Sequence, residues 1–108
     1  MAFKSIVTPN IGTSGSASTV TEVVGAGQTQ TLIGFSFANT SAVNVTVAAR
    51  LNKSGGGSAF LIKDASVLPG GALAIVGGDQ KLVLETGDTI DAYASAGSSV
   101  DVIVSYLV

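Results

Sequence analysis

Short runs of alternating apolar and polar residues recur along most of this chain. In residues 31–39 the positions Ile33, Phe35 and Phe37 are large and apolar, and the residues between them are small. In residues 43–51 every second residue is again apolar. Because side chains on a strand point alternately to opposite faces, this period of two predicts two strands, each with one face in a core. Only a short turn separates the runs, so we expect them to pair as an antiparallel hairpin.

Turn sequences divide the rest of the chain. Pro69 and Gly70 fit the centre of a type II turn, because proline presets φ and glycine accepts a positive φ. In the later Glu-Thr-Gly-Asp turn, Gly87 takes the left-handed position and Asp88 caps the turn through its own side chain. Residues 52–58, with three consecutive glycines, are expected to form a flexible loop. Further strands are expected over residues 59–63, 72–76, 81–85, 89–94 and 100–108.

These signals predict an all-β fold, a single antiparallel β-sandwich or jelly-roll-like domain of about seven or eight short strands. The beginning of the chain differs, because residues 8–16 are rich in Gly, Ser and Thr. We therefore expect an N-terminal arm over residues 1–28, with one strand near residues 18–24, and a sandwich domain over residues 29–108. The arm is expected either to pack on a neighbouring subunit or to fray as a tail.

The last predicted strand is apolar on both faces toward its end. One face carries valines and Tyr106, and the other carries Ile103 and Leu107. Such a strand is either covered on both sides or part of a subunit interface. Ile103 and Leu107 are therefore the candidates for self-association.

The composition excludes most catalytic and metal-binding chemistry. The 108 residues include no Cys, His or Trp, which excludes disulfides, thiolate or imidazole metal sites and Ser-His-Asp triads. The net charge of −2 argues against nucleic-acid binding. No apolar stretch reaches the ~20 residues of a membrane-spanning helix, and the N-terminus does not resemble a signal peptide. We therefore expect synthesis in the cytoplasm and neither a membrane nor a nucleic-acid partner.

The small number of charged residues also indicates what kind of surface the protein has. Only 11% of residues are charged, against about a quarter in an average protein. Ser, Thr and Ala lose little on burial compared with ionised groups. This composition favours a protein whose surface is buried against copies of the same chain or against a partner. The alternative is a monomer with a polar, nearly uncharged surface.

Few residues are candidates for a ligand site. Glu85, Asp88 and Asp91 could bind calcium together with backbone carbonyls, but their spacing matches no calcium motif. We assign no catalytic residue, metal or cofactor, and expect no enzyme. Tyr93 lies on the polar face of its predicted strand, which makes it the candidate for a surface contact, with cross-strand packing as the alternative.

Most of the chain after residue 30 resembles one class of proteins. The segments that carry the resemblance are residues 33–39, 43–47, 60–65, 68–71, 81–88 and 94–102. They resemble small accessory virion proteins of tailed bacteriophages. The resemblance implies a non-enzymatic β-sandwich protein present in many copies on the virion, with capsid decoration (a cement protein) as the first interpretation. A neck, tail or fibre-associated protein is one alternative, and a carbohydrate- or cell-surface-binding module is another.

The first interpretation predicts partners. The protein would be made in the host cytoplasm and form a symmetric homo-oligomer on the virion, with a trimer as one candidate. It would bind the major capsid protein or another virion protein, and it would stabilise the shell by binding only the assembled state. The arm lies outside the resemblance, but its apolar residues Ile6, Val7 and Ile11 are our candidates for docking on the capsid.

Overall fold

The computed structural model describes residues 2–21, 24–76 and 81–108. A short 3-10 turn, η1 (Ser14–Ser16), lies between the first two strands, and these ranges contain no helix long and apolar enough to cross a membrane. The all-β prediction is confirmed. The strands are β1 (Phe3–Thr8), β2 (Ser18–Thr19), β3 (Gln30–Asn39), β4 (Val45–Asn52), β5 (Ser58–Val67), β6 (Ala72–Val76), β7 (Leu82–Leu84), β8 (Thr89–Ala94) and β9 (Val100–Leu107).

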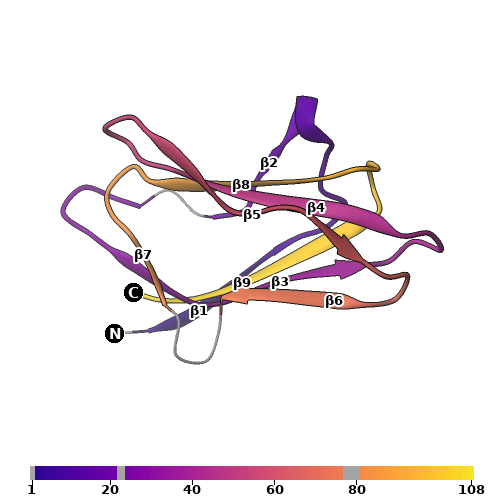
Figure 1. The fold of residues 1–108 in the computed structure, drawn as a ribbon. Coiled ribbons are helices and arrows are strands. Elements are labelled where there is room, and N and C mark those ends of the chain that lie inside the picture. Colours follow the sequence, from indigo (N-terminus) through magenta and orange to yellow (C-terminus); the bar gives the residue numbers. More distant parts are fainter. Residues whose placement is uncertain (1, 22–23, 77–80) are drawn as a thin grey trace.

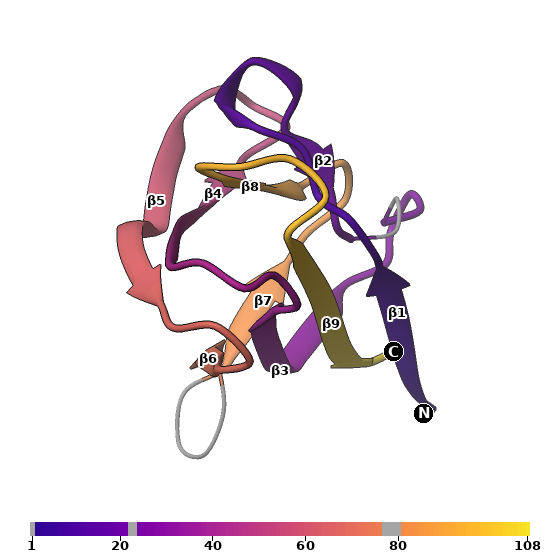
Figure 2. The ribbon, with the colours of Figure 1, turned by 90° about the vertical axis from the view of Figure 1, so that its right-hand side faces the viewer.

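The strands form two antiparallel sheets that face each other in a sandwich-like arrangement (Figures 1 and 2). The first sheet has the order β1-β9-β3-β6, and β7 also pairs with β3. The second sheet has the order β2-β8-β4-β5. β6 and β7 lie in line along β3, since Val76 is opposite Phe35 and Leu82 is opposite Leu32. They therefore act as one strand with an interruption.

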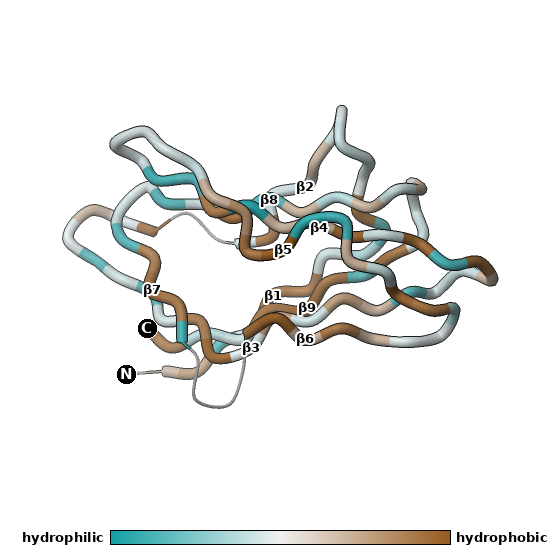
Figure 3. Tube along the Cα trace, viewed as in Figure 1, coloured by the Kyte–Doolittle hydropathy of each residue, from teal (hydrophilic) through white to brown (hydrophobic). Residues whose placement is uncertain are grey.

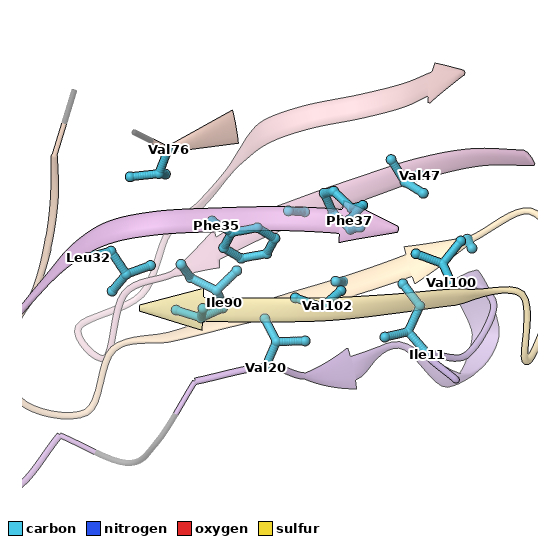
Figure 4. Packing of buried hydrophobic residues seen from close by; sticks show 14 of the residues in the cluster. Ile11, Val20, Leu32, Phe35, Phe37, Val47, Val76, Ile90, Val100 and Val102 are labelled. Atoms are coloured by element: carbon cyan, nitrogen blue, oxygen red, sulfur yellow. The ribbon is translucent and has the colours of Figure 1, made fainter. Parts of the chain in front are cut away.

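The core lies between the sheets and consists of the inward-facing side chains of both (Figures 3 and 4). Phe35 and Phe37 are at its centre, with ring centroids 5.2 Å apart. The predicted apolar faces of residues 43–51 and of the last strand are confirmed in their central parts, whereas Val43 and Val108 lie outside the strands and are exposed. The buried members of these two faces are Val45, Val47, Ala49, Val100, Val102, Val104 and Tyr106.

Ile33 departs from the predicted pattern. The pairing of β3 with β9 skips one residue between Leu32 and Gly34, so Ile33 is the additional residue of a β-bulge. Leu32 is fully buried in its place, and Ile33 is only partly buried. The prediction that Ile33 shares the core face with Phe35 was wrong, because a bulge moves the alternation by one residue.

The predicted hairpin of residues 31–39 and 43–51 was also wrong. β3 and β4 belong to different sheets, and the hairpin partner of β4 is β5. The buried side chain of Asn39 holds the crossing between the sheets. Its amide donates to the carbonyl oxygens of Val43 at 2.8 Å and Val67 at 3.0 Å, and its carbonyl accepts the Ser41 N–H at 2.9 Å. Alternation shows which side of a strand is buried but does not identify the neighbouring strand.

The N-terminal segment is part of the same body. β1 pairs with β9 along its whole length, and β2 pairs with β8, so each sheet receives an edge strand from residues 2–21. Ile11 and Val20 are fully buried in the core. A boundary between arm and domain at residue 28 therefore does not divide the structure. The predicted strand at residues 18–24 is present only as Ser18–Thr19, and residues 22–23 lie outside the described ranges.

Both predicted turns are confirmed. Gly70 has a φ of +71°, and the Gly71 N–H donates to the Leu68 carbonyl at 2.9 Å, as in a type II turn. Gly87 has a φ of +82°, and the Asp88 N–H donates to the Glu85 carbonyl at 3.0 Å.

Candidate functional site

The outer face of the first sheet carries large apolar side chains that the core does not use. Phe3 of β1 lies opposite Leu107 of β9, and Val7 lies opposite Ile103. Directly opposed residues project to the same face of a sheet, and for these four it is the face away from the core. Phe3 is 75% exposed, Val7 64% and Ile103 47%.

The pairings extend these side chains into rows across the sheet. One row continues from Phe3 and Leu107 through Thr31 to Val83, which is 51% exposed. A second row continues from Val7 and Ile103 through small residues of β3 and β6. Between the two rows lies a row of small residues. We call these residues together the apolar face: Phe3, Ser5, Val7, Thr31, Gly34, Ser36, Ala38, Ala72, Ala74, Val83, Asp101, Ile103, Ser105 and Leu107.

Charge is nearly absent from the apolar face. Asp101 is its one ionisable member, and it lies at one end, where its Oδ1 accepts the Asn10 backbone N–H at 2.9 Å. A sheet face with apolar ridges and few ionised groups loses little hydration when another surface covers it. It also presents little like charge to a second copy of itself.

The structure gives a mixed outcome for the predicted interface residues. Ile103 and Leu107 lie on an outer face, as predicted. Val7 joins them there, so it belongs to the same surface and not to a separate arm. Ile6 packs against the core and Ile11 is fully buried in it, so neither is available to dock on a capsid. They therefore do not form a docking surface, because β1 is an edge strand of the first sheet and the segment after it packs into the core.

Phe3 and Val83 were not predicted for this surface. Phe3 lies on an edge strand that is exposed on most of both faces, so its sequence shows no clean alternation. Val83 was assigned to a strand, but the pairing of that strand with β3 determines which face it joins. Neither position carries a signal in the sequence that identifies the face.

The outer face of the second sheet is different in character. Asp91 accepts a hydrogen bond from the Asn52 amide at 3.0 Å and lies 3.8 Å from the Arg50 guanidinium. Arg50 and Lys63 both lie over the ring of Phe60, at 5.9 Å and 5.2 Å from its centroid. Polar and ionised groups therefore gather on this sheet, while the first sheet is left apolar.

Asp88 anchors two loops at one end of the molecule. Its carboxylate is 1% exposed. Oδ2 accepts the Glu85 backbone N–H at 2.9 Å, which confirms the predicted cap, and Oδ1 accepts the Ser54 N–H at 3.1 Å. Lys53 Nζ contacts Oδ2 and also Glu85 Oε1 at 3.0 Å. The hydrogen bond from Lys53, followed by that from the Glu85 N–H, lowers the pKa of Asp88 below its ordinary value.

The three calcium candidates are thus not gathered at one site. Glu85 and Asp88 share an ion pair with Lys53, and Asp91 faces Arg50 on the second sheet. Within residues 2–21, 24–76 and 81–108, no group of three or more carboxylates is arranged to hold a metal ion.

Tyr93 lies partly buried on the outer face of the second sheet, on the polar side of β8 as predicted. It lines a hollow of about 270 Å³. The hollow is bordered by the η1 turn and by residues of β4, β5 and β8. Its lining residues are Thr13, Ser14, Thr46, Asp64, Tyr93, Ala94 and Ser95.

Comparisons with protein-family models, with curated proteins and with solved structures give no match to this chain. Its function must therefore be inferred from its own surfaces. The apolar face is the larger of the two features, because it extends across every strand of the first sheet.

Proposed function

We propose that this protein is a non-enzymatic virion structural protein of a tailed bacteriophage, which self-associates and binds and stabilises the assembled capsid. The observation that carries the proposal is the apolar face. Exposed apolar side chains in register on paired strands, with one carboxylate at the end, are what a surface covered in an assembly requires. The resemblance of residues 31–108 to accessory virion proteins supplies the biological setting.

The strand order supports a jelly-roll assignment. If β6 and β7 are taken as one interrupted strand, the chain has eight strands, and the first pairs with the eighth and the second with the seventh. The third likewise pairs with the sixth and the fourth with the fifth. An antiparallel ribbon folded over into two sheets has this order, and jelly rolls of this kind occur in viral capsid and lectin domains. The fold is therefore compatible with a viral capsid domain and with a lectin domain, and it does not distinguish these two functions.

A second copy of the chain fits the apolar face best. The two rows of large apolar side chains, which begin at Phe3 and Val7, form ridges on either side of a row made of Ser5, Ser105 and Gly34. A two-fold-related copy can place one of its ridges over this row of small residues, and an isologous contact of this type closes on itself. Many copies held in this way, each binding only assembled shell, would stabilise a capsid by mass action.

The self-association step predicts the behaviour of Ile103→Asp. We expect the wild-type protein to elute as an oligomer, with a mass that is a multiple of 10.6 kDa in size-exclusion chromatography with light scattering. The variant should be monomeric at the same concentration, since burying an unpaired carboxylate costs several kcal/mol and weakens association at least ~100-fold. Ser66→Asp, at an exposed position of β5 on the other sheet, is the matched control and should remain oligomeric. A wild-type monomer would contradict the proposal.

Virion binding is tested separately by co-sedimentation with purified capsids. Saturable binding to assembled shells, with slower heat-induced shell rupture, would support decoration. Binding to isolated necks, tails or fibres but not to shells would replace decoration with a role at those sites. Binding to neither, together with a glycan signal, would favour a carbohydrate-binding module.

A further inference from the structure

We infer that the hollow beside Tyr93 is a binding site for one ring of a neutral sugar. This inference is independent of the proposed assembly role, because it concerns the opposite sheet. The η1 turn stands over β8 and β4 beside β5 (Figure 2), so the hollow has a wall on one side and the sheet as its floor. Its volume of about 270 Å³ lies just below the ~300 Å³ at which sites for drug-sized ligands begin, a size suited to a single ring.

A bulge in β5 builds one side of the hollow. Along β4 and β5, Val47 lies opposite Ala65 and Ala49 lies opposite Ile62, so two residues of β5 share the place opposite Ala48. Asp64 is one of them, and its φ of +54° is in the left-handed region. Aspartate tolerates this conformation better than most residues. Bulges re-aim side chains and are frequent beside functional sites, and this one places Asp64 at the hollow.

The carboxylate of Asp64 is available for a ligand. It is exposed, and no hydrogen bond or ion pair within the described residues engages it, unlike the carboxylates of Asp88, Asp91 and Asp101. A carboxylate accepts hydrogen bonds through both oxygens. It can therefore accept from two neighbouring hydroxyls, which is a pattern that a sugar ring presents.

The other polar groups have complementary roles. The Thr46 N–H donates to Ser95 Oγ at 3.0 Å, and the Ser95 N–H donates to the Thr46 carbonyl at 2.9 Å. This reciprocal pair fixes the Ser95 hydroxyl and leaves its proton free to donate to a ligand. Thr13 makes no side-chain capping bond to the η1 turn, so its hydroxyl also remains available at the wall.

The chemistry of the lining selects the class of ligand. Tyr93 supplies an aromatic ring against which the C–H groups of a sugar can pack. Among the described residues, none that lines the hollow is cationic, which disfavours phosphate, sulfate and acidic sugars. One carboxylate alone is too few for a calcium site. An aromatic ring, one carboxylate and several hydroxyls fit an uncharged polyol ring.

The test uses the full-length protein and four probes: glucose, galactose, mannose and N-acetylglucosamine, each at tens of millimolar. Amide chemical shifts in heteronuclear NMR spectra report the binding site. We expect at least one probe to shift the amides of Asp64, Tyr93 and Ser95 in a saturable way. If none of the four does so, the inference is overturned.

Two variants decide whether the hollow itself binds. Tyr93→Leu removes the ring and should weaken binding of the active probe about tenfold. Asp64→Asn keeps a residue that tolerates a positive φ and should weaken binding severalfold even if Tyr93→Leu fails to fold. Phe60→Leu removes an exposed aromatic ring of the same sheet that does not line the hollow, and it should bind as wild type. Unchanged binding in Asp64→Asn, or an equal loss in Phe60→Leu, would overturn the inference.

Discussion

Replacing Ile11 by alanine is expected to destabilise the protein by about 2–5 kcal/mol, the range for large-to-small substitutions in a core. Ile11 is fully buried although it follows a segment rich in small polar residues. Its backbone is held as well, because its N–H donates to the Val100 carbonyl at 2.9 Å and its carbonyl accepts the Ser98 N–H at 3.4 Å. The site therefore has little freedom to collapse around a cavity.

This loss is large compared with the ~5–15 kcal/mol of a typical domain. Urea denaturation followed by circular dichroism gives the free energy of unfolding and its change. Ser5→Ala is the control from the same segment, since Ser5 is exposed on β1, and it should change stability by less than about 0.5 kcal/mol. If Ile11→Ala were as mild as the control, the N-terminal segment would behave as the separate arm that its composition suggested.

The N-terminal segment shows why composition misled. Glycine, serine and threonine in residues 8–16 are typical of linkers, yet this stretch carries the chain from the edge of one sheet to the edge of the other. The single large apolar residue in that stretch, Ile11, is the one that enters the core. Sequence patterns report local conformation, and this burial depends on contacts with β9, which is distant in sequence.

The same limit applies to strand neighbours. Alternation correctly predicted that Phe35, Phe37 and Val47 face inward, because the period of two depends only on the strand itself. It did not predict that Asn39 carries the chain across to the second sheet, since that requires partners at Val43 and Val67. Nothing in the sequence around Ile33 distinguishes the bulge from a regular strand position.

The two surfaces differ in how far the sequence predicted them. Ile103 and Leu107 were identified because β9 is apolar on both faces, a pattern contained in one strand. The hollow is formed by four separate segments, and of its members only Tyr93 was singled out. Asp64 could not be, because its availability depends on a bulge in the pairing of β4 with β5.

The second large effect is expected at Asp88. In an Asp88→Asn variant the side-chain amide would keep one acceptor oxygen, whereas the wild-type carboxylate accepts through both: Oδ1 from Ser54, and Oδ2 from Glu85 and Lys53. One set of donors would then face the amide NH₂ group, and Lys53 would lose its buried counter-ion. We expect a clear fall in the urea midpoint at neutral pH, smaller than that of Ile11→Ala.

The pH dependence follows from the direction of the pKa shift. The pKa of Asp88 in the folded protein is lowered from an ordinary value of 3.8, chiefly by the hydrogen bond from Lys53. The unfolded chain therefore binds a proton first as the pH falls. The stabilisation from Asp88 is complete well above 3.8, declines as the pH falls through that value toward the folded pKa, and is absent below both. The pKa of Lys53 is raised from 10.5, so its contribution is lost only in alkali.

Free energies of unfolding measured from about pH 7 down to about pH 3 should separate these effects. The wild-type protein should lose stability steeply at the acidic end, and Asp88→Asn should start lower and lose less. Lys53→Met removes the largest cause of the shift, so the remaining carboxylate should begin to take up its proton at a higher pH than in the wild type. Ser66→Ala, an uncharged substitution at an exposed position of β5, is the control, and its acid profile should follow the wild type. Parallel profiles for the wild type and Asp88→Asn would mean that the Lys53–Asp88 contact does not govern the acid sensitivity of the fold.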